Sequence, residues 1–500
     1  MNLVGLGLTI HDSSIAAYKN GKFLYRKAER ETGVKHAHAS VDWAAKVLKE
    51  WEIENPIISQ ATWLKGKDPS KLTDTHYRLD HHYAHLLSSP KKYKFNYVVD
   101  AWSVGPANTE EQQSWYTGLV QDGDNIQRIQ DHPIPTVLKA ALWSKYFDGE
   151  TRLRNFHKQM RKENYKKIHV LDGFFKNFLT AENIKKHWVD IASSIDLPGK
   201  IMGLQSYGKP DMKEVNEWLQ MPFPRSTVTS LSESLIDIDV NDIATIHKFC
   251  EKSLQQRINT TEPFGYSGGV AQNVVFNRAM LDSGYKPEVY PWAYDGGCSI
   301  GALNFLLDKH DIERPNHWEQ DDQSPLERPQ RSLVKRVAEL IAQNKVVGWY
   351  QGHGEVGPRA LGNRSILFNP AHKDGKTTIN KVKQREWWRP FGASVKEDQA
   401  ERFFDLPVSR HMLYNSKVKY SGIPAVTHVD GTCRHQTVPQ ENELYYELLD
   451  EVEKLIDVPI VGNTSLNIKG KPIVATIEDA KKIKLDAICI GNELYENLHS

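Results

Sequence analysis

Residues 262–280 read EPFGYSGGVAQNVVFNRAM, a short apolar run, a pair of glycines and then a stretch with helical spacing. This order predicts a buried strand, a tight glycine turn and a helix. Residues 288–307, EVYPWAYDGGCSIGALNFLL, repeat the order and place Asp295 in the turn. Strands that alternate with helices across glycine turns are typical of an α/β domain, so these two stretches set the predicted fold class.

The sequence before and after these two stretches indicates where the domains begin and end. Residues 2–9 alternate apolar residues with glycine, as a buried strand does, and Asn20-Gly21 predicts a type I′ hairpin turn. Residues 309–331 hold many charges with almost no apolar periodicity, which predicts a linker. We therefore expect a first domain over residues 1–308 and a second α/β domain over residues 332–500.

The bulk composition is that of an ordinary globular protein, with 500 residues, 39% hydrophobic residues and a net charge of +1. Such a balance gives no overall field for nucleic acid or membrane. The four cysteines form no CxxC pair, which argues against a zinc knuckle or a disulfide scaffold. The sequence shows no bilayer-spanning apolar run and no basic region typical of a signal peptide, so a cytoplasmic location is expected.

Residues 79–89, LDHHYAHLLSS, place three histidines within five residues. In a helix, His81 and His85 stand at i and i+4 on one face, whereas His82 points elsewhere. Two imidazoles at this spacing can bind one cation. A polar helix end is the other interpretation, and the motif alone leaves both open.

Basic, hydroxyl and amide side chains recur at strand ends through the second domain. Glycine lets backbone N–H groups approach an anion, and arginine offers a planar fork to phosphate or carboxylate. Each stretch alone fits a solvated loop, but together they predict a pocket for a phosphorylated small molecule. The stretches are residues 352–365, 381–395, 427–438 and 461–474.

Two further stretches of the first domain carry candidate functional groups. Ser267–Asn273, SGGVAQN, is a glycine turn before a helix, which suits a phosphate at the helix N-terminus or simply tight packing. His11 and Asp12 directly follow the first strand. Asp12 suits a turn or helix cap, and His11 suits a general base because imidazole titrates near neutrality.

Taken in order along the chain, these stretches resemble the ATP-dependent O-carbamoyltransferase family that modifies nodulation factors and antibiotics. The resemblance covers most of the chain and fades between residues 131 and 190. It is carried by HDSSIAA (11–17), HHYAH (81–85), GKIMGLQSYGKP (199–210), SGGVAQN (267–273), YDGGCSIGAL (294–303), GEVGPRALGNRSIL (354–367), REWWRPFGASV (385–395), THVDGT (427–432) and NTSLNIKGKPIV (463–474).

The resemblance implies an actin-like ATPase-type N-terminal domain, as in tRNA threonylcarbamoyl-transferases. It implies a C-terminal α/β domain like threonylcarbamoyl-adenylate synthase. The second domain would join carbamoyl phosphate to ATP, accompanied by Mg, to give carbamoyl-adenylate. The first would move the carbamoyl group to an acceptor hydroxyl beside a metal, Fe(II) or another divalent ion.

The resemblance also assigns roles to residues of this sequence. His11 matches the base for the acceptor hydroxyl. The glycine turn is the candidate nucleotide site of the first domain, through Ser267, Gly268, Gly269 and Asn273. The metal ligands would be His81, His85, Asp100 and Asp295. The side chains that hold carbamoyl phosphate and adenylate would be Arg359, Lys383, Arg389, Arg434, Asn463 and Ser465.

The alternative functions are a tRNA threonylcarbamoyl-transferase and an inactive nucleotide-binding scaffold. The acceptor is a separate question. Residues 151–170 carry seven Lys or Arg against one Glu, with aromatic residues between them. Such a run fits a solvated basic helix, or a patch for nucleic acid whose hydroxymethylated pyrimidine would be the acceptor. A sugar or small-molecule hydroxyl needs no such patch.

Overall fold

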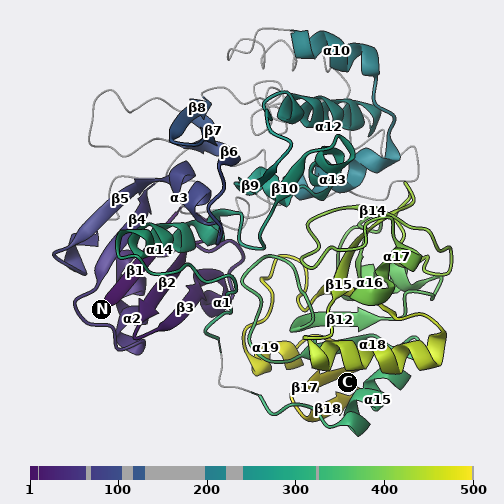
Figure 1. The fold of residues 1–500 in the computed structure, drawn as a ribbon. Helices are drawn as coiled ribbons and strands as arrows, with labels where there is room; N and C mark the ends of the chain where they lie inside the picture. Colours follow the sequence, from purple (N-terminus) through teal and green to yellow (C-terminus); the bar gives the residue numbers. More distant parts are fainter. Residues whose placement is uncertain are drawn as a thin grey trace, which may run out of the picture. The chain divides into compact units, whose positions relative to one another are not determined.

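A computed structural model describes residues 1–9, 11–62, 69–103, 116–129, 197–220, 240–322 and 326–497. These residues form sheets with parallel and antiparallel strands, accompanied by helices (Figure 1), so the predicted α/β fold class is confirmed. They group into two compact units, Met1–Arg78 with Tyr290–Ser500, and Leu79–Val289. The predicted first domain is thus divided between the units, and its boundaries stay a prediction. No helix in the described ranges has the length and apolar character needed to cross a bilayer.

The first sheet has the strand order β3-β2-β1-β4-β5. β1, β2 and β3 form an antiparallel meander through the predicted Asn20-Gly21 turn, and β4 pairs in parallel with β1. The strands are β1 (Asn2–Gly7), β2 (Ser14–Lys19), β3 (Lys22–Lys27), β4 (Ile57–Thr62) and β5 (His76–Asp80). The accompanying helices are α1 (Ala28–Thr32), α2 (Val41–Glu50), η1 (Pro69–Lys71), η5 (Asp295–Gly297) and α14 (Cys298–Lys309).

Both faces of this sheet are covered, which explains the apolar character of β1. Val4 and Leu6 pack in one cluster with residues of α2, whereas Leu3 packs in another with residues of α14. Because successive side chains point to opposite faces, one strand serves both cores. Gly5 lies under α14, where a Cβ would overlap the backbone of that helix. The glycines of the first strand therefore allow α14 to approach the sheet closely.

The second unit contains another five-stranded sheet, of order β10-β9-β6-β7-β8. β6, β7 and β8 form an antiparallel meander, β9 is parallel to β6, and β10 is parallel to β9. The chain enters this sheet in the same order as the first, which is the duplicated arrangement of an actin-like fold. The strands are β6 (Phe95–Ser103), β7 (Tyr116–Asp122), β8 (Asn125–Ile129), β9 (Pro263–Ser267) and β10 (Lys286–Glu288).

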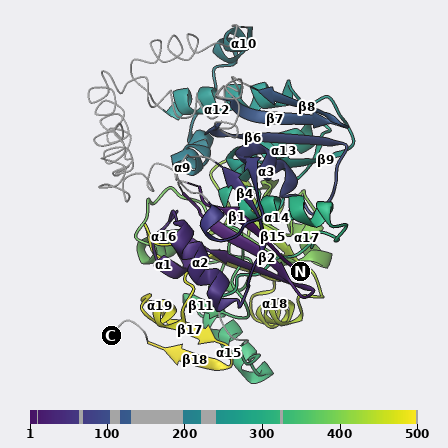
Figure 2. The same cartoon turned by 90° about the vertical axis from the view of Figure 1, so that its left-hand side faces the viewer.

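The helices of the second unit pack mainly on one another and on this sheet. α3 contacts β6 and β9, and α12 contacts α10 and α13 (Figure 2). They are α3 (His81–Leu87), α9 (Leu197–Leu204), η3 (Gln205–Tyr207), α10 (Met212–Gln220), α12 (Val240–Gln255), η4 (Gly269–Gln272) and α13 (Val274–Asp282).

The C-terminal domain is built on an eight-stranded sheet of order β14-β15-β13-β16-β12-β11-β17-β18. Its strands are β11 (Val347–Tyr350), β12 (Arg364–Phe368), β13 (Gly392–Lys396), β14 (Ser416–Lys417), β15 (Thr432–Val438), β16 (Ile460–Ser465), β17 (Ala487–Ile490) and β18 (Glu493–Glu496). Its helices are α15 (Arg331–Ala342), α16 (Gly375–Val382), η6 (Glu397–Gln399), α17 (Ala400–Phe403), α18 (Glu443–Ile456) and α19 (Ile477–Lys481).

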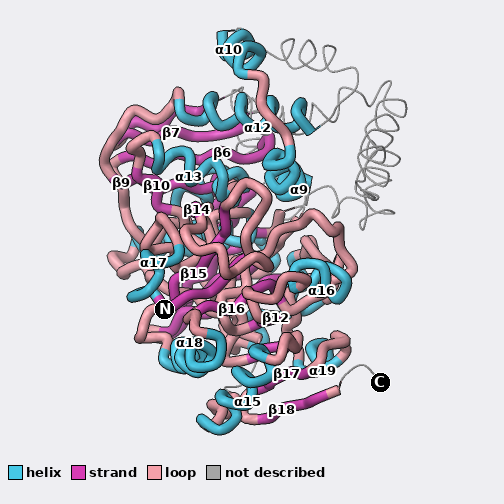
Figure 3. Tube along the Cα trace, turned by 90° about the vertical axis from the view of Figure 1, so that its right-hand side faces the viewer, coloured by secondary structure: helices cyan, strands magenta, loops and turns pink. Residues whose placement is uncertain are grey.

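Alternating side chains of these strands fill two cores, one on each face of the sheet. On β12, Ile366 and Phe368 join the cluster that includes residues of α16 and α17, whereas Leu367 joins the cluster with α15 and α18. Figure 3 traces the central strands in magenta and these helices in cyan. This domain is therefore a sheet covered by helices on both faces, as an α/β domain requires.

The predicted linker contains an ordered stretch that packs against both neighbours. Gln320 N donates a hydrogen bond to Gly354 O at 3.0 Å, and Asp321 N donates to Tyr25 O at 2.8 Å. Asp322 pairs with Arg364 at 3.2 Å. This polar stretch therefore makes backbone and side-chain contacts with residues that precede it and residues that follow it in the sequence.

A test of the packing under α14 is the substitution Gly5→Ala. The added methyl group would overlap Ser299 O and Leu303 N, both backbone atoms that have no rotamer to change. We expect a loss of about 3 kcal/mol in the free energy of unfolding, measured in denaturant. Gly199→Ala on α9, which meets no neighbouring atom, is the control and should not destabilise. Equal stability of the two variants would contradict this packing.

Candidate functional site

The histidine pair lies on α3, as the sequence predicted. Asp80 caps this helix, since its side chain accepts a hydrogen bond from Tyr83 N at 3.0 Å. His81 and His85 face the same side, with ring centroids 4.7 Å apart. Burial, followed by the charge of His81, lowers the pKa of His82 to about 4, so this third imidazole is neutral at pH 7.

Asp100 on β6 joins the two histidines. Its Oδ2 lies 3.1 Å from His81 Nε2 and 2.9 Å from His85 Nε2. Burial by itself raises the pKa of this carboxyl, but the charges and hydrogen bonds of His85 and His81 outweigh burial and hold the pKa well below its usual range. An ionised carboxylate and two imidazoles therefore converge in one buried cluster.

The glycine turn after β9 is built around this cluster. Gly269 N donates a hydrogen bond to Asp100 Oδ1 at 3.1 Å, and Ser267 Oγ donates to His85 O at 2.9 Å. Gly268 has a φ of 93°, a left-handed conformation that favours glycine. The turn thus holds the side chain of Asp100 and the backbone of His85.

Asn273 ends the same turn and has partners of its own. Its Oδ1 accepts hydrogen bonds from Val275 N at 3.1 Å and Phe276 N at 3.2 Å, which caps α13. Its Nδ2 lies 3.0 Å from Nε2 of the buried His247. Nucleotide binding by Ser267, Gly268, Gly269 and Asn273 stays a prediction, since the structure gives this turn a role in packing and orientation.

The donor set of the cluster fits a divalent transition metal. Two imidazole nitrogens with one carboxylate suit Fe(II), and also manganese or zinc. His81, His85 and Asp100 would hold the ion from within the second unit. Asp295, which the sequence suggested as a fourth ligand, belongs to the first unit, and its part in metal binding stays a prediction.

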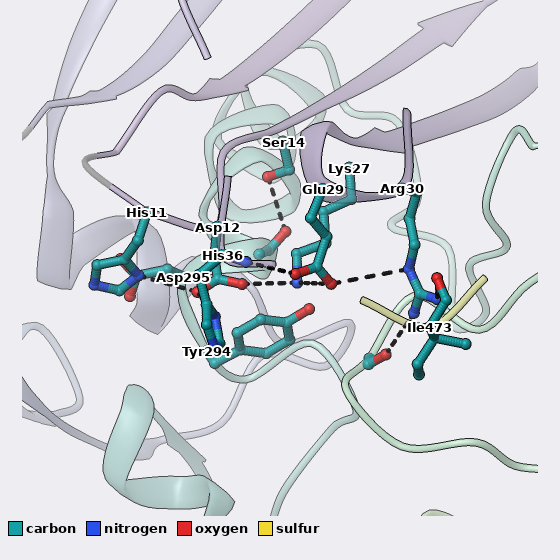
Figure 4. Close-up of polar contacts among 12 residues, drawn as sticks. His11, Asp12, Ser14, Lys27, Glu29, Arg30, His36, Tyr294, Asp295 and Ile473 are labelled. Atoms are coloured by element: carbon teal, nitrogen blue, oxygen red, sulfur yellow. Dashed lines mark hydrogen bonds and ion pairs between the residues drawn. The ribbon is translucent and has the colours of Figure 1, made fainter. Parts of the chain in front are cut away.

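His11 lies between β1 and β2, in contact with two carboxylates (Figure 4). Its Nδ1 is 3.0 Å from Asp12 Oδ2 and 3.6 Å from Asp295 Oδ2. Because Nδ1 faces these carboxylates, Nε2 is the ring nitrogen left on the opposite edge. The arrangement suits a histidine that accepts a proton at Nε2 while its other nitrogen is held.

Asp12 is the centre of a buried polar network (Figure 4). Its Oδ1 lies 2.7 Å from Lys27 Nζ, and its Oδ2 lies 2.8 Å from His36 Nδ1. Burial raises the pKa of Asp12, but the charges of His36 and Lys27 and the hydrogen bond with His11 outweigh it, so the pKa is well below its usual range. Asp12 is therefore an ionised partner that orients His11.

Lys27 completes the network from the end of β3. Its Nζ lies 2.8 Å from Glu29 Oε1 and 4.6 Å from the centre of the Tyr294 ring. Asp12, Glu29 and His36 have the spacing of a metal site, but the ammonium group of Lys27 pairs with both carboxylates. With Arg30 3.9 Å from Glu29, two cations of the chain itself face these two carboxylates, so their charge is balanced without a metal.

Clustered arginines form the second candidate site, in the C-terminal domain. Burial, followed by the charges of Arg434 and Arg389, holds the pKa of Arg359 well below the usual arginine value. Burial, opposed in part by Cys433, and the charge of Arg389 lower the pKa of Arg434 to about 10. The pKa of Arg385 is also well below its usual value, because of burial and then the charges of Arg389 and Arg434. The side chains of Arg359, Arg385 and Arg434 are half-buried, and the charge of a neighbouring arginine lowers the pKa of each.

Lys383 adds another cation and fixes the turn after β16. Its Nζ donates hydrogen bonds to Ser465 Oγ at 3.3 Å and to Asn467 Oδ1 at 2.7 Å. Burial and then the charge of Arg385 hold its pKa well below the usual lysine value. Glu386 is the acid beside these cations, 3.8 Å from Arg389. Such a group of neighbouring cations suits a ligand with several negative charges.

Asn463 lies deeper than a residue that lines a pocket. It is completely buried, and its Nδ2 donates to Ser394 Oγ at 2.9 Å and Ala360 O at 3.2 Å. Through Ala360 it supports the residue next to Arg359. Direct contact of Asn463 with a ligand stays a prediction.

Glu355 shapes the loop that carries Arg359. Its Oε1 accepts hydrogen bonds from Leu361 N at 2.7 Å, Asn363 N at 2.9 Å and Arg364 N at 3.2 Å. One carboxylate thus closes the whole loop from residue 355 to 364. Sequence reasoning missed this role, although a lone acid among glycines and arginines is a usable signal.

Sequence reasoning also missed Lys27, Glu29, His36 and Arg385 as parts of these sites. The first three lie in FLYRKAERETGVKHAH, where charged residues directly follow an apolar strand. That juxtaposition is the available signal, because charges at the end of a buried strand need buried partners. Arg385 stands in a stretch already identified as basic, and its neighbours Asn380 and Pro390 hold it in place.

Comparison with known proteins bears directly on the cationic pocket. The family model "Carbamoyltransferase C-terminus" matches residues 338–497. The second domain is therefore similar to a carbamoyltransferase C-terminal domain. The matched residues include Arg359, Lys383, Arg389 and Arg434, to which the resemblance gave a role in holding carbamoyl phosphate and adenylate.

Curated relatives of this chain include nodulation proteins. Nodulation protein NolNO of Sinorhizobium fredii is 33% identical over 354 residues, which is 59% of this chain and 52% of that protein. Nodulation protein U of Azorhizobium caulinodans is 32% identical over 262 residues, 48% of this chain and 47% of that protein. The predicted resemblance to this family is confirmed. The chain spans about half the length of the curated relatives it matches.

Solved structures offer weaker likenesses. Full-length HypF in a phosphate- and nucleotide-bound form has 12% identity and a TM-score of 0.35, over 61% of this chain and 47% of that one. Sua5 of P. abyssi in complex with L-threonine has 16% identity and a TM-score of 0.25, over 33% of this chain and 49% of that one. These scores are low, so the fold rests on the strand order of the chain itself.

The metal cluster is tested by His85→Ala. Loss of one of three converging donors should reduce the bound metal from about one ion per chain to a small fraction, measured by elemental analysis after dialysis. His247→Ala removes another buried imidazole of the same unit, outside the cluster, and should keep its metal. A His85→Ala protein that folds and retains the metal of the parent would show that α3 holds no ion.

Proposed function

We propose that this protein is an ATP-dependent O-carbamoyltransferase that makes carbamoyl-adenylate and then transfers the carbamoyl group to an acceptor hydroxyl. One observation carries the proposal: the cations of Arg359, Lys383, Arg385, Arg389 and Arg434 gather in a domain that matches the carbamoyltransferase C-terminal family. A pocket with this charge suits a substrate pair that brings several phosphates together.

The first half-reaction takes place at these cations. Hydrolysis of carbamoyl phosphate gives carbamate and phosphate. An oxygen of the carbamate then attacks the α-phosphorus of ATP. Pyrophosphate leaves with the electron pair of the bond that breaks, and carbamoyl-adenylate remains. Negative charge develops on phosphate oxygens in this step, so fixed guanidinium and ammonium groups lower its barrier. Mg accompanies ATP as usual for a nucleoside triphosphate.

The second half-reaction uses His11. Its Nε2 accepts the proton of the acceptor hydroxyl as the hydroxyl oxygen attacks the carbamoyl carbon, and AMP leaves with the electron pair of the broken C–O bond. Asp12 holds Nδ1 at 3.0 Å during this transfer and stabilises the imidazolium that forms. A divalent ion held by His81, His85 and Asp100 would supply Lewis-acid stabilisation of the developing negative charge.

For the acceptor we propose the hydroxyl of a sugar or another small molecule. The basic segment 151–170, which left a nucleic-acid acceptor open beside a solvated helix, lies outside the described residues. The joined second domain, with its own cationic pocket, supports carbamoyl transfer over a tRNA threonylcarbamoyl-transferase. The charged network around His11 supports an active enzyme over an inactive scaffold, since buried charges are costly to keep.

The variants Arg359→Ala and Arg389→Ala test the first half-reaction. Each removes a charge-assisted contact to phosphate, so the rate of carbamoyl-phosphate-dependent pyrophosphate release should fall by roughly 100-fold. The exposed Arg402 of α17 is the control, and Arg402→Ala should keep the parent rate. If the parent releases pyrophosphate without carbamoyl phosphate, or if neither pocket variant is slower, the proposed function is wrong.

A further inference from the structure

Arg30 on α1 makes an unusual contact with the C-terminal domain. The residue is 6% exposed. Its Nη1 donates to Ile473 O at 2.8 Å, and its Nη2 lies 3.4 Å from Glu355 O and from Gly357 O (Figure 4). One buried guanidinium thus binds backbone carbonyls of two separate loops. All of these residues belong to the first compact unit.

The loop at residues 355–357 is seated on the first domain by other contacts as well. Tyr294 donates its hydroxyl hydrogen to Val356 O at 3.2 Å. The Val356 side chain is buried in an apolar cluster with Trp292 and Trp318. A Cβ at Gly357 would lie 2.7 Å from Pro291 O, so the two backbones are as close as glycine allows. Every residue of this short stretch therefore has a fixed position.

The loops that Arg30 holds adjoin the cationic residues along the chain. Arg359 follows Gly357 by two residues. The other loop, which includes Ile473, follows the turn where Lys383 bonds Ser465 and Asn467. The turn after α1 also lies toward the pocket, because Lys35 is one of the charges that lower the pKa of Lys383, after burial and Arg385. Glu29, the neighbour of Arg30 on α1, lies 3.9 Å from the Arg30 guanidinium and pairs with Lys27 of the His11 network.

We propose that Arg30 is a positioning residue of the adenylate-forming pocket, through which the first domain braces the two pocket loops of the second. This rests on the proposed function, because it assigns Arg30 a part in the same first half-reaction. Arg30 touches no reacting atom in that step. It fixes the backbone from which Arg359 reaches the phosphates, and the backbone beyond the turn that Lys383 anchors.

An arginine is needed for this task. A guanidinium presents N–H donors in one plane in a rigid fork, so it serves carbonyls of two loops at once. Lysine offers donors on a flexible stem and would keep only part of the contact, and methionine would keep none. The series arginine, lysine, methionine at position 30 should therefore loosen the pocket stepwise.

The test measures binding of inorganic pyrophosphate to the full chain by titration calorimetry. We expect Arg30→Met to weaken binding by about tenfold, and Arg30→Lys to weaken it less. The control is Arg26→Met, because Arg26 lies on the adjoining strand β3 and its partners there, Glu50, Asp321 and Trp51, all lie outside the pocket loops. It should bind pyrophosphate as the parent does.

A second readout separates positioning from mere stability. In pyrophosphate release, Arg30→Met should raise the KM for carbamoyl phosphate, whereas partial unfolding would lower the apparent kcat and leave KM unchanged. If Arg30→Met does not fold, Tyr294→Phe removes one hydroxyl contact to the same loop and should weaken pyrophosphate binding by about threefold.

The outcomes distinguish the two proposals. A parent protein that binds no pyrophosphate contradicts the proposed function and the pocket with it. A parent that binds pyrophosphate, with folded Arg30→Met and Tyr294→Phe variants that bind it equally well, overturns the role of Arg30 and leaves the proposed function standing.

Discussion

The buried ammonium group of Lys27, paired with Asp12 and Glu29, is the interaction on which the candidate sites of the first unit depend. Breaking such a buried pair typically costs about 3–5 kcal/mol, since it leaves an uncompensated charge. Asp12 Oδ1 lies 2.7 Å from Lys27, and Asp12 Oδ2 lies 3.0 Å from His11. On the other side, Glu29 belongs to the same short helix as Arg30. The two ion pairs of Lys27 therefore hold both the partner of the proposed base and the helix that contacts the pocket loops.

The two polar clusters of this unit differ in how their charge is balanced. Around Asp12, Lys27 pairs with both carboxylates, and His11 and His36 lie within 3.0 Å of Asp12, which suits a framework that orients one imidazole. Around Arg359 and Arg434, cations lower one another's pKa values and Glu386 is the acid beside them. A buried excess of one sign is unfavourable until a ligand of the opposite sign arrives. The charges of the first cluster are matched within the chain, whereas the second cluster suits a ligand with several negative charges.

Sequence reasoning predicted the α/β class and the pairing of His81 with His85, because strand and helix periodicities are local signals. It predicted the arginine stretches for the same reason, since each lies within a few residues. It did not predict Lys27, whose partners are set by the turn of Asp12 into a left-handed conformation with φ 55°. It also did not predict that Asp322, within the expected linker at residues 309–331, contacts Arg364 at 3.2 Å. Such long-range polar contacts have no period along the chain, so only the fold reveals them.

The central claim is that the carbamoyl group passes through an adenylate. Its most direct test uses carbamoyl phosphate labelled with heavy oxygen in its carbonyl and bridging positions, supplied with unlabelled ATP. An oxygen of the carbamate becomes the bridge to the α-phosphorus, and it stays with AMP when water or an acceptor attacks the carbamoyl carbon. The account predicts labelled oxygen in the phosphate of AMP, measured by mass spectrometry. AMP that forms without the label would contradict it.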